Sequence, residues 1–160
     1  MKAALFVGGW EGHAPMDFAN WYSDLLQATG FDVVVHDTLA PLEDPASLAD
    51  LSLITPIWSS ARSGHRAEFG NMTKPQEDGL LKLIGDGCGL AGWHGHLGDA
   101  FRDRPTYHFL IGGQFVAHPP GWPDILQPAE DYIDYDVTIC KPDDPMVQGI
   151  RSYRLTSEHY

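Results

Sequence analysis

The chain has 160 residues, of which 43% are hydrophobic and 20% charged, a balance typical of one folded domain with a sizeable core. Its formal net charge of −12, with only ten Lys and Arg residues, argues against a nucleic-acid partner, because phosphate binding needs clustered positive charge. Two cysteines, Cys88 and Cys140, imply no disulfide framework and favour a reducing cytoplasm.

Three short apolar runs in the first 60 residues have the length of buried parallel strands. They lie at Ala3–Val7, Phe31–His36 and Leu53–Trp58. The first run reaches Gly8-Gly9 too soon for a signal peptide, and we expect no membrane partner because no run is long enough to span a bilayer.

Helical segments are expected between these runs. The first begins near Pro15 and ends at Gly30, a residue type common after helix C-termini. Its expected apolar face comprises Phe18, Tyr22, Leu25 and Leu26. A short helix is expected at Pro45–Leu51, followed after the third run by a polar loop, Ser59–Thr73, and a helix at Lys74–Ile84. The apolar face of this last helix comprises Leu80, Leu81 and Ile84.

The stretch from Gly87 to Arg102 carries the fourth strand and a sharp turn. Gly89–Trp93 has the pattern of a buried strand, His94-Gly95-His96 breaks it, and Leu97–Phe101 resembles a helix. Alternating strands and helices with apolar strands indicate a parallel sheet covered on both faces. The sequence therefore predicts an α/β fold, a doubly wound and mostly parallel sheet with helices on both faces, in which Leu90–Trp93 joins the three earlier strands.

The pattern changes after Phe101. We expect a strand-like piece at Ile111–Pro119, a loop at Pro119–Pro128 and a half-exposed strand at Ile133–Cys140. A short helix should begin at Asp144 and end near Gly149, before a final strand-like piece at Tyr153–Tyr160.

Ligands of such sheets bind beyond the carboxyl ends of the strands. The loops expected there, Gly8–Pro15, Trp58–Thr73 and His94–Asp99, contain His13, His65, His94 and His96. His94 occupies the apex of Gly92-Trp93-His94-Gly95, which has the form of a nucleophile elbow with histidine in place of Ser or Cys. A helix N-terminus disfavours the imidazolium, so His94 is expected to be neutral and to act as a base or a metal ligand.

Several partners and alternatives stay open for this histidine. Glu11 or His13 could reach it from the first loop as catalytic partners. Histidines with a carboxylate could hold zinc or another divalent metal, and the candidate ligands are His13, His94, His118 and Glu158. The alternative for His94 is a buried histidine with only a structural role.

Two other kinds of chemistry fit less well. Gly8-Gly9-Trp10-Glu11-Gly12 does not match a dinucleotide-binding motif, and Glu11 would repel a pyrophosphate. Both cysteines are interpreted as packing residues, so no thiol chemistry is expected. Trp10, Trp58 and Trp93 fall at predicted strand ends and could stack on the apolar face of a sugar, although core packing is the common role of tryptophan.

With these residues in view, the chain resembles the trehalose-utilisation (ThuA-like) family of the class I glutamine-amidotransferase-like superfamily. The matching pieces are Gly8–His13, Pro56–Trp58, Gly89–Gly95, Gly98–Arg102, Gly112–Pro119 and Ser157–Tyr160. The resemblance implies a flavodoxin-like sandwich in which His94 replaces the amidotransferase cysteine. It also implies a bacterial, cytoplasmic role in carbohydrate metabolism, acting on trehalose-type or 3-keto disaccharides. His96, Asp99 and Gln114 are expected to bind the sugar beside the three tryptophans.

The chain departs from the family pattern in two places. Ser59–Thr73 is longer and more polar than the corresponding loop. We also expect residues 1–160 to form a single ThuA-like domain without the family's usual C-terminal strand and helix. We expect an enzyme that hydrolyses or isomerises a sugar, with a non-catalytic sugar-binding or regulatory domain as the alternative. A Cys-dependent amidotransferase is disfavoured. The expected partner is a small-molecule sugar, and homo-oligomerisation stays open.

Overall fold

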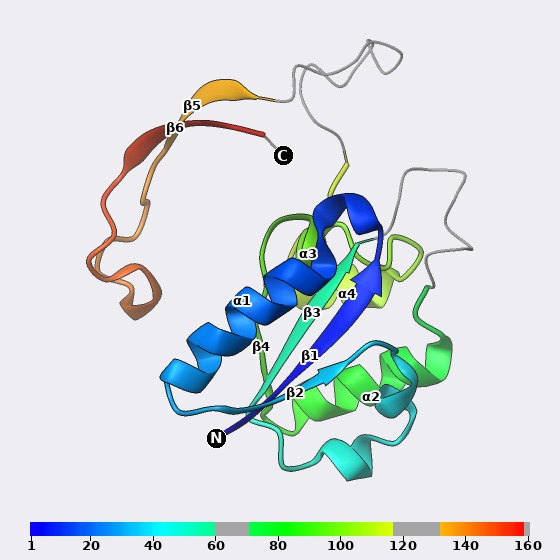
Figure 1. The fold of residues 1–160 in the computed structure, drawn as a ribbon. Coiled ribbons are helices and arrows are strands. Elements are labelled where there is room, and N and C mark those ends of the chain that lie inside the picture. Colours follow the sequence, from blue (N-terminus) through cyan, green and yellow to red (C-terminus); the bar gives the residue numbers. More distant parts are fainter. Residues whose placement is uncertain (60–70, 117–131, 159–160) are drawn as a thin grey trace. The chain divides into compact units, whose positions relative to one another are not determined.

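The computed structural model describes residues 1–59, 71–116 and 132–158 of the chain (Figure 1). The described residues divide into two compact units, Met1–Gln114 and Phe115–Tyr160. No helix in these ranges is long and apolar enough to cross a membrane.

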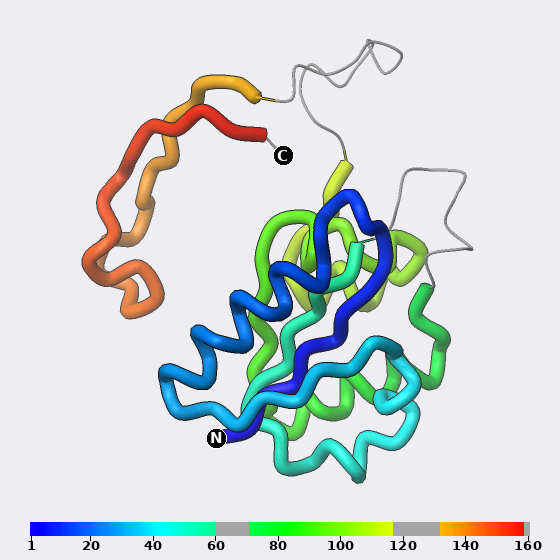
Figure 2. Tube along the Cα trace, viewed as in Figure 1, coloured from blue at the N-terminus to red at the C-terminus, as the bar shows by residue number. Residues whose placement is uncertain are grey.

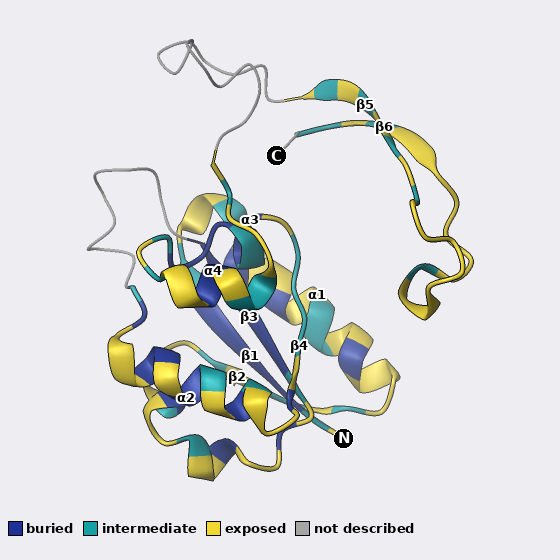
Figure 3. Cartoon of the chain, turned by 180° about the vertical axis from the view of Figure 1, so that it is seen from behind, coloured by how far each residue is buried: buried dark blue, intermediate teal, exposed yellow. Residues whose placement is uncertain are grey.

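The first unit contains a four-stranded parallel sheet. In chain order its strands are β1 (Lys2–Gly9), β2 (Asp32–His36), β3 (Leu53–Ser59) and β4 (Gly89–Leu90), and their spatial order is β2-β1-β3-β4. All three pairings are parallel, as the sequence predicts. Figure 3 shows that β1 and β3 are buried along most of their length, which explains their near-continuous apolar sequences.

Helices cover both faces of this sheet. The α-helices of the first unit are α1 (Pro15–Ala28), α2 (Lys74–Gly85), α3 (His94–Gly98) and α4 (Pro105–Ile111), and the 3₁₀ turns are η1 (Glu11–His13), η2 (Ala40–Glu43) and η3 (Pro45–Leu48). Successive residues of β1 point to opposite faces, so Leu5 packs with Ala19 and Leu26 of α1, whereas Phe6 packs with Leu80 of α2. This three-layer arrangement is the flavodoxin-like fold that the sequence predicts.

The helical faces are rotated from those expected. In α1 the buried residues are Pro15, Ala19 and Leu26, whereas Phe18 and Leu25 are exposed. In α2 the buried face contains Leu80 and Leu83, while Leu81 is only partly buried. The small Ala19 packs with residues of β1, whereas the larger neighbours Phe18 and Leu25 are exposed.

The expected helix at Pro45–Leu51 is wrong in type, because the segment forms the single 3₁₀ turn η3. β4 comprises only two residues where five were expected, although the Ala91 N–H still donates to Ile54 O at 3.1 Å. α3 begins at His94 and ends at Gly98. His94–His96 therefore form the first turn of this helix rather than a break before it, and Leu97–Phe101 is not a separate helix.

The strand expected from Ile111 is also wrong over its described part, because Ile111 ends α4 and 112–116 form no strand. Pro105 begins this helix, and Gly112, with a φ of 77°, ends it. The rest of that expected strand, the loop at Pro119–Pro128 and most of Ser59–Thr73 lie outside the described residues.

The second unit contains an antiparallel pair, β5 (Ile133–Val137) and β6 (Tyr153–Ser157). Partly buried and exposed residues alternate along β5, which confirms the half-exposed strand that the sequence predicts. The connection contains the 3₁₀ turn η4 (Pro145–Val147), where the Met146 N–H donates to the Asp144 side chain at 2.9 Å. Arg154 and Asp136 form an ion pair across the two strands at 3.2 Å.

Candidate functional site

Three connections of the first unit meet at the carboxyl ends of β1, β3 and β4. They are the η1 turn after β1, the last residue of β3, which is Ser59, and helix α3 after β4. Figure 2 shows η1 and α3 at the same end of the sheet. The Trp10 N–H donates to Ser59 O at 3.0 Å, so the exit of β1 is joined to the exit of β3 by a backbone hydrogen bond.

Three histidine rings come together at this edge. The ring centroid of His13 is 5.3 Å from that of His94 and 5.7 Å from that of His96. The exposure of the three side chains differs, because His94 is exposed, His13 is partly buried and His96 is 2% exposed. The cluster therefore extends from the surface into the interior.

The turn that presents His94 has an unusual backbone. Trp93 is extended and precedes the helix, and His94 begins it with a φ of 49°, in the left-handed region. Of the described non-glycine residues, only Ala14, His94 and Phe101 have a positive φ. A side chain raised on a left-handed turn between a strand and a helix has the form of a nucleophile elbow.

Glycine is required beside this turn. A Cβ on Gly95 would overlap the ring of His13 and lie 2.8 Å from its Nδ1 atom. A Cβ on Gly92 would lie 2.8 Å from Cβ of Leu97. These two glycines allow the His13 ring and the first turn of α3 to approach more closely than a side chain would permit.

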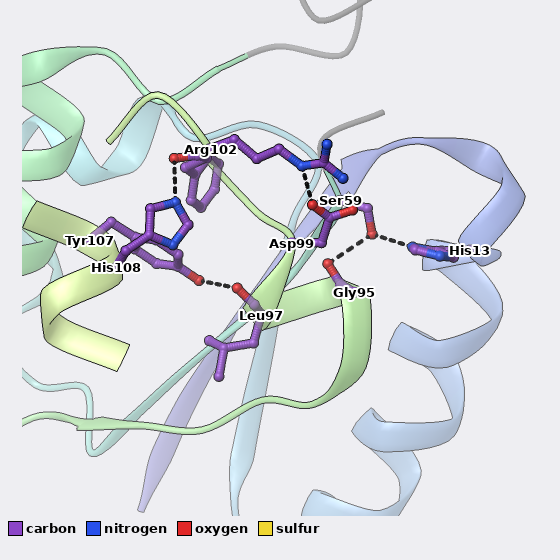
Figure 4. Close-up of polar contacts among 9 residues, drawn as sticks. His13, Ser59, Gly95, Leu97, Asp99, Arg102, Tyr107 and His108 are labelled. Atoms are coloured by element: carbon purple, nitrogen blue, oxygen red, sulfur yellow. Dashed lines mark hydrogen bonds and ion pairs between the residues drawn. The ribbon is translucent and has the colours of Figure 1, made fainter. Parts of the chain in front are cut away.

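A hydrogen-bonded network joins the three connections (Figure 4). The Ser59 hydroxyl lies between His13 and Gly95, 2.6 Å from Nδ1 of His13, and donates to Gly95 O at 3.2 Å. Nε2 of His96 donates to His13 O at 3.0 Å. The position of His13 is therefore fixed by β3 through its ring and by α3 through its backbone.

His96 is neutral at physiological pH. Burial lowers its pKa from 6.5, and the nearby His13 and His94 act in the same direction, although the hydrogen bond to His13 O opposes them. Since Nε2 faces a carbonyl oxygen, it carries the hydrogen of the neutral ring. Nδ1 is buried and has no hydrogen-bond partner among the described residues.

Residues after α3 hold the helix in place. The Tyr107 hydroxyl donates to Leu97 O at 2.9 Å, and His108 Nε2 donates to Phe101 O at 3.2 Å (Figure 4). Burial raises the pKa of Tyr107, so its hydroxyl remains a donor. Arg102 forms an ion pair with Asp99, a predicted sugar-binding residue that is 7% exposed.

The other predicted site residues are dispersed. Glu11 is exposed on the same turn as His13, and Gln114 is exposed at the end of the first unit. The ring of Trp10 is 38% exposed and its centroid lies 4.9 Å from that of His13, whereas Trp58 is 7% exposed and packs in the core. The catalytic role predicted for Glu11 and the sugar-binding roles predicted for Gln114 and for these tryptophans stay predictions.

Trp93 lies in an aromatic cluster next to the histidines. Its ring centroid is 4.9 Å from that of Tyr22, 5.9 Å from that of Trp21 and 5.7 Å from that of His96. Phe18 contacts both Trp93 and His96, at 6.1 and 5.0 Å between centroids. One side of α1 therefore borders the candidate site, and it includes Phe18 and Tyr22, which were expected on the apolar face of this helix, as well as Trp21, which was not.

The metal prediction receives no support from the described residues. Within residues 1–59, 71–116 and 132–158, no three His, Cys, Asp or Glu side chains are grouped so as to hold a metal ion. His118 lies outside these ranges, and Glu158 belongs to the second unit. A metal site made by His13, His94, His118 and Glu158 stays a prediction.

The two cysteines differ in their surroundings. Cys88 is buried, and burial raises the pKa of its thiol, as expected for a packing residue. Cys140 is exposed, so its interpretation as a packing residue is wrong, because it follows β5 where the second unit buries little surface.

Sequence reasoning missed Ser59 and Tyr107. A serine at the end of a strand gives no local signal of a histidine 46 residues away. The sequence indicated the position of Ser59 only through topology, because Ser59 ends the strand next to β1 at the carboxyl edge of the sheet, where ligand-binding loops lie. Tyr107 lay in a segment to which no helix was assigned.

The comparisons with known proteins concern the fold and the family of the chain. A crystal structure of a ThuA-like protein from Bacteroides uniformis superposes with a TM-score of 0.71 at 17% sequence identity. The match covers 100% of this chain and 60% of that protein, so it shows a shared fold over part of the longer relative. No curated protein sequence matches the chain. The family model for ThuA, described as trehalose utilisation, matches residues 2–160. The chain therefore belongs to the ThuA trehalose-utilisation family.

Proposed function

We propose that the chain binds a trehalose-type disaccharide, or a 3-keto derivative of one, and transforms it with His13 and His94 as an acid–base pair. The single observation that carries the proposal is the approach of these two rings to 5.3 Å from separate connections at the carboxyl edge of a parallel sheet. Membership of the trehalose-utilisation family supports the sugar as the ligand class.

The proposed chemistry is proton transfer to and from the two imidazoles. In a hydrolysis, the neutral histidine accepts a proton from the attacking water, and the other histidine, as imidazolium, protonates the leaving oxygen. In an isomerisation, the neutral histidine accepts a proton from the carbon next to the carbonyl group, and the imidazolium protonates the carbonyl oxygen. The left-handed turn presents His94 at the surface, where a ligand can meet it. Trp10, exposed beside His13, offers an aromatic face to the apolar side of a pyranose ring.

The test compares three histidines at the same edge of the sheet. His13→Ala and His94→Ala should each reduce turnover of the disaccharide about 10²–10⁴-fold, the usual contribution of a general acid or base. His36→Ala is the matched control, because His36 ends the neighbouring strand β2 and stacks on Phe6 at 5.0 Å, away from the cluster. Products are followed by NMR, and sugar binding by calorimetry.

Each result has a separate meaning. If His13→Ala and His94→Ala turn over the sugar as well as His36→Ala, the acid–base pair is refuted. If the unaltered chain binds the disaccharide without converting it, and both site variants weaken that binding, the chain is a sugar-binding domain. If no disaccharide binds, the ligand class is wrong.

A further inference from the structure

We propose that Ser59 is a positioning residue that holds His13 in the Nδ1–H tautomer, so that Nε2 of His13 is the basic nitrogen of the site. The structural part of this proposal stands on hydrogen-bond geometry alone, whereas its catalytic consequence rests on the proposed function.

The assignment follows from the number of hydrogens available. The Ser59 hydroxyl has one hydrogen and two close polar neighbours, Gly95 O at 3.2 Å and Nδ1 of His13 at 2.6 Å. A carbonyl oxygen can only accept, whereas an imidazole nitrogen can donate or accept. Both contacts are hydrogen bonds only if the serine hydrogen points to Gly95 and Nδ1 of His13 carries a hydrogen of its own.

Burial makes this arrangement costly to abandon. Ser59 is 1% exposed and Gly95 is buried, so water is not at hand to replace a lost partner. In the opposite tautomer, Ser59 would have to turn its hydrogen toward Nδ1, and Gly95 O would lose its donor. An unsatisfied buried polar group costs about 1–3 kcal/mol, which is enough to decide between two tautomers of similar intrinsic free energy.

The neutral ring of His13 then has its lone pair on Nε2. This nitrogen lies on the far side of the ring from Ser59, and it is the acceptor nitrogen of the neutral ring. In serine proteases a hydrogen-bond partner at Nδ1 fixes the tautomer of the histidine in the same way, and Nε2 is again the base. In those enzymes the partner is a carboxylate. Here the orienting group is an uncharged hydroxyl, so it sets the tautomer without adding a negative charge.

His96 provides an internal contrast. Its Nε2 faces His13 O, so its neutral form carries the hydrogen on Nε2 and the lone pair on Nδ1. The two neighbouring histidines should therefore be opposite tautomers in the same molecule. Within the part of the chain that the structure describes, the Ser59 hydroxyl contacts the ring of His13 and makes no hydrogen bond to His96.

The experiment measures tautomers directly. Long-range proton–nitrogen NMR correlations of the full chain, labelled with ¹⁵N, distinguish protonated from unprotonated ring nitrogens at a pH where the rings are neutral. His13 should be protonated at Nδ1 and His96 at Nε2. Ser59→Ala should shift His13 toward the Nε2–H tautomer, which free neutral histidine prefers in water, and should leave His96 unchanged.

Thr55→Val is the matched control. Thr55 lies on the same strand, is fully buried, and its hydroxyl has no hydrogen-bond partner among the described residues. This variant removes a buried hydroxyl from β3 without touching His13, so both tautomers should persist. Turnover should fall about 10–100-fold in Ser59→Ala, as when an outer hydrogen-bond partner of a functional histidine is removed, and stay near normal in Thr55→Val.

The possible results separate the two proposals. An Nε2–H tautomer of His13 in the unaltered chain overturns the positioning role, and this measurement does not depend on whether Ser59→Ala folds. An unchanged His13 tautomer in folded Ser59→Ala overturns it as well. If the tautomers are as expected but no disaccharide binds, Ser59 still positions His13 and it is the proposed function that fails.

Discussion

A methyl group added at Gly95 should displace His13 with little effect on folding. Gly95→Ala places a Cβ over the His13 ring, 2.8 Å from Nδ1, whereas real Cβ contacts are essentially never shorter than 3.0 Å. The overlap falls on the ring itself, so His13 must move by more than the few tenths of an ångström that a tight contact absorbs. A misplacement of about 1 Å in a catalytic group can cost about 10²-fold in rate, and we expect a loss of that order.

The free energy of unfolding should change much less. Alanine is favoured over glycine inside a helix by about 1 kcal/mol, and this gain offsets part of the strain from the displaced ring. Gly98→Ala is the control, because Gly98 lies in the same helix and a Cβ there meets nothing within 4 Å. It gains the same helix propensity without disturbing the site.

The assay combines three measurements on both variants: disaccharide turnover, the NMR signals of the His13 ring, and urea unfolding followed by circular dichroism. Gly95→Ala should shift the His13 signals and lose turnover, while Gly98→Ala should do neither. The reasoning is refuted if the two variants have the same turnover and the same His13 signals.

Two further predictions concern the fold around the site. Gly79→Ala should lower the free energy of unfolding by about 2 kcal/mol despite better helix propensity, because a Cβ there would overlap a backbone carbonyl oxygen of η2. Gly85→Ala, at an open position of the same helix, should raise the free energy of unfolding slightly. Equal urea midpoints for the two variants would contradict this prediction. Burial lowers the pKa of His96 below its unfolded value of 6.5, so below about pH 6.5 the unfolded chain binds a proton that the folded chain does not. Stability should therefore fall with pH from about 6.5 down to the lowered pKa, and His96→Gln should lose part of this slope in urea unfolding; an unchanged slope would show that His96 does not titrate this way.

The parallel sheet could be predicted because its signal is local. Continuous apolar runs mark β1 and β3 and leave little choice of element or pairing. The helix boundaries were harder to predict from the sequence. Gly95 suggests an interruption between secondary-structure elements, whereas in the structure it lies inside α3 and makes room for the ring of His13. Helix α4 was missed because most of Pro105–Ile111 consists of residue types that favour a strand by propensity, namely Thr106, Tyr107, Phe109 and Ile111.

The candidate site was predictable only through topology. Placing His13 and His94 at the carboxyl ends of strands of one parallel sheet brought them to the same edge, and the structure has their rings in contact. Hydrogen-bond partners carry no such signal, because a bond such as that between Ser59 and His13 depends on side-chain directions that no periodicity encodes. The sequence thus indicates which loops meet and leaves open which atoms bond.

His94 has a left-handed backbone, so the residue that occupies this turn is not the residue type that would stabilise it most. A non-glycine residue in this region costs about 1–2 kcal/mol, and glycine would remove most of that cost. Selection for stability alone would therefore favour glycine at this position. The histidine found there lowers stability relative to glycine, so the path of the backbone does not account for its presence, and the chemistry of its imidazole is the remaining reason for it.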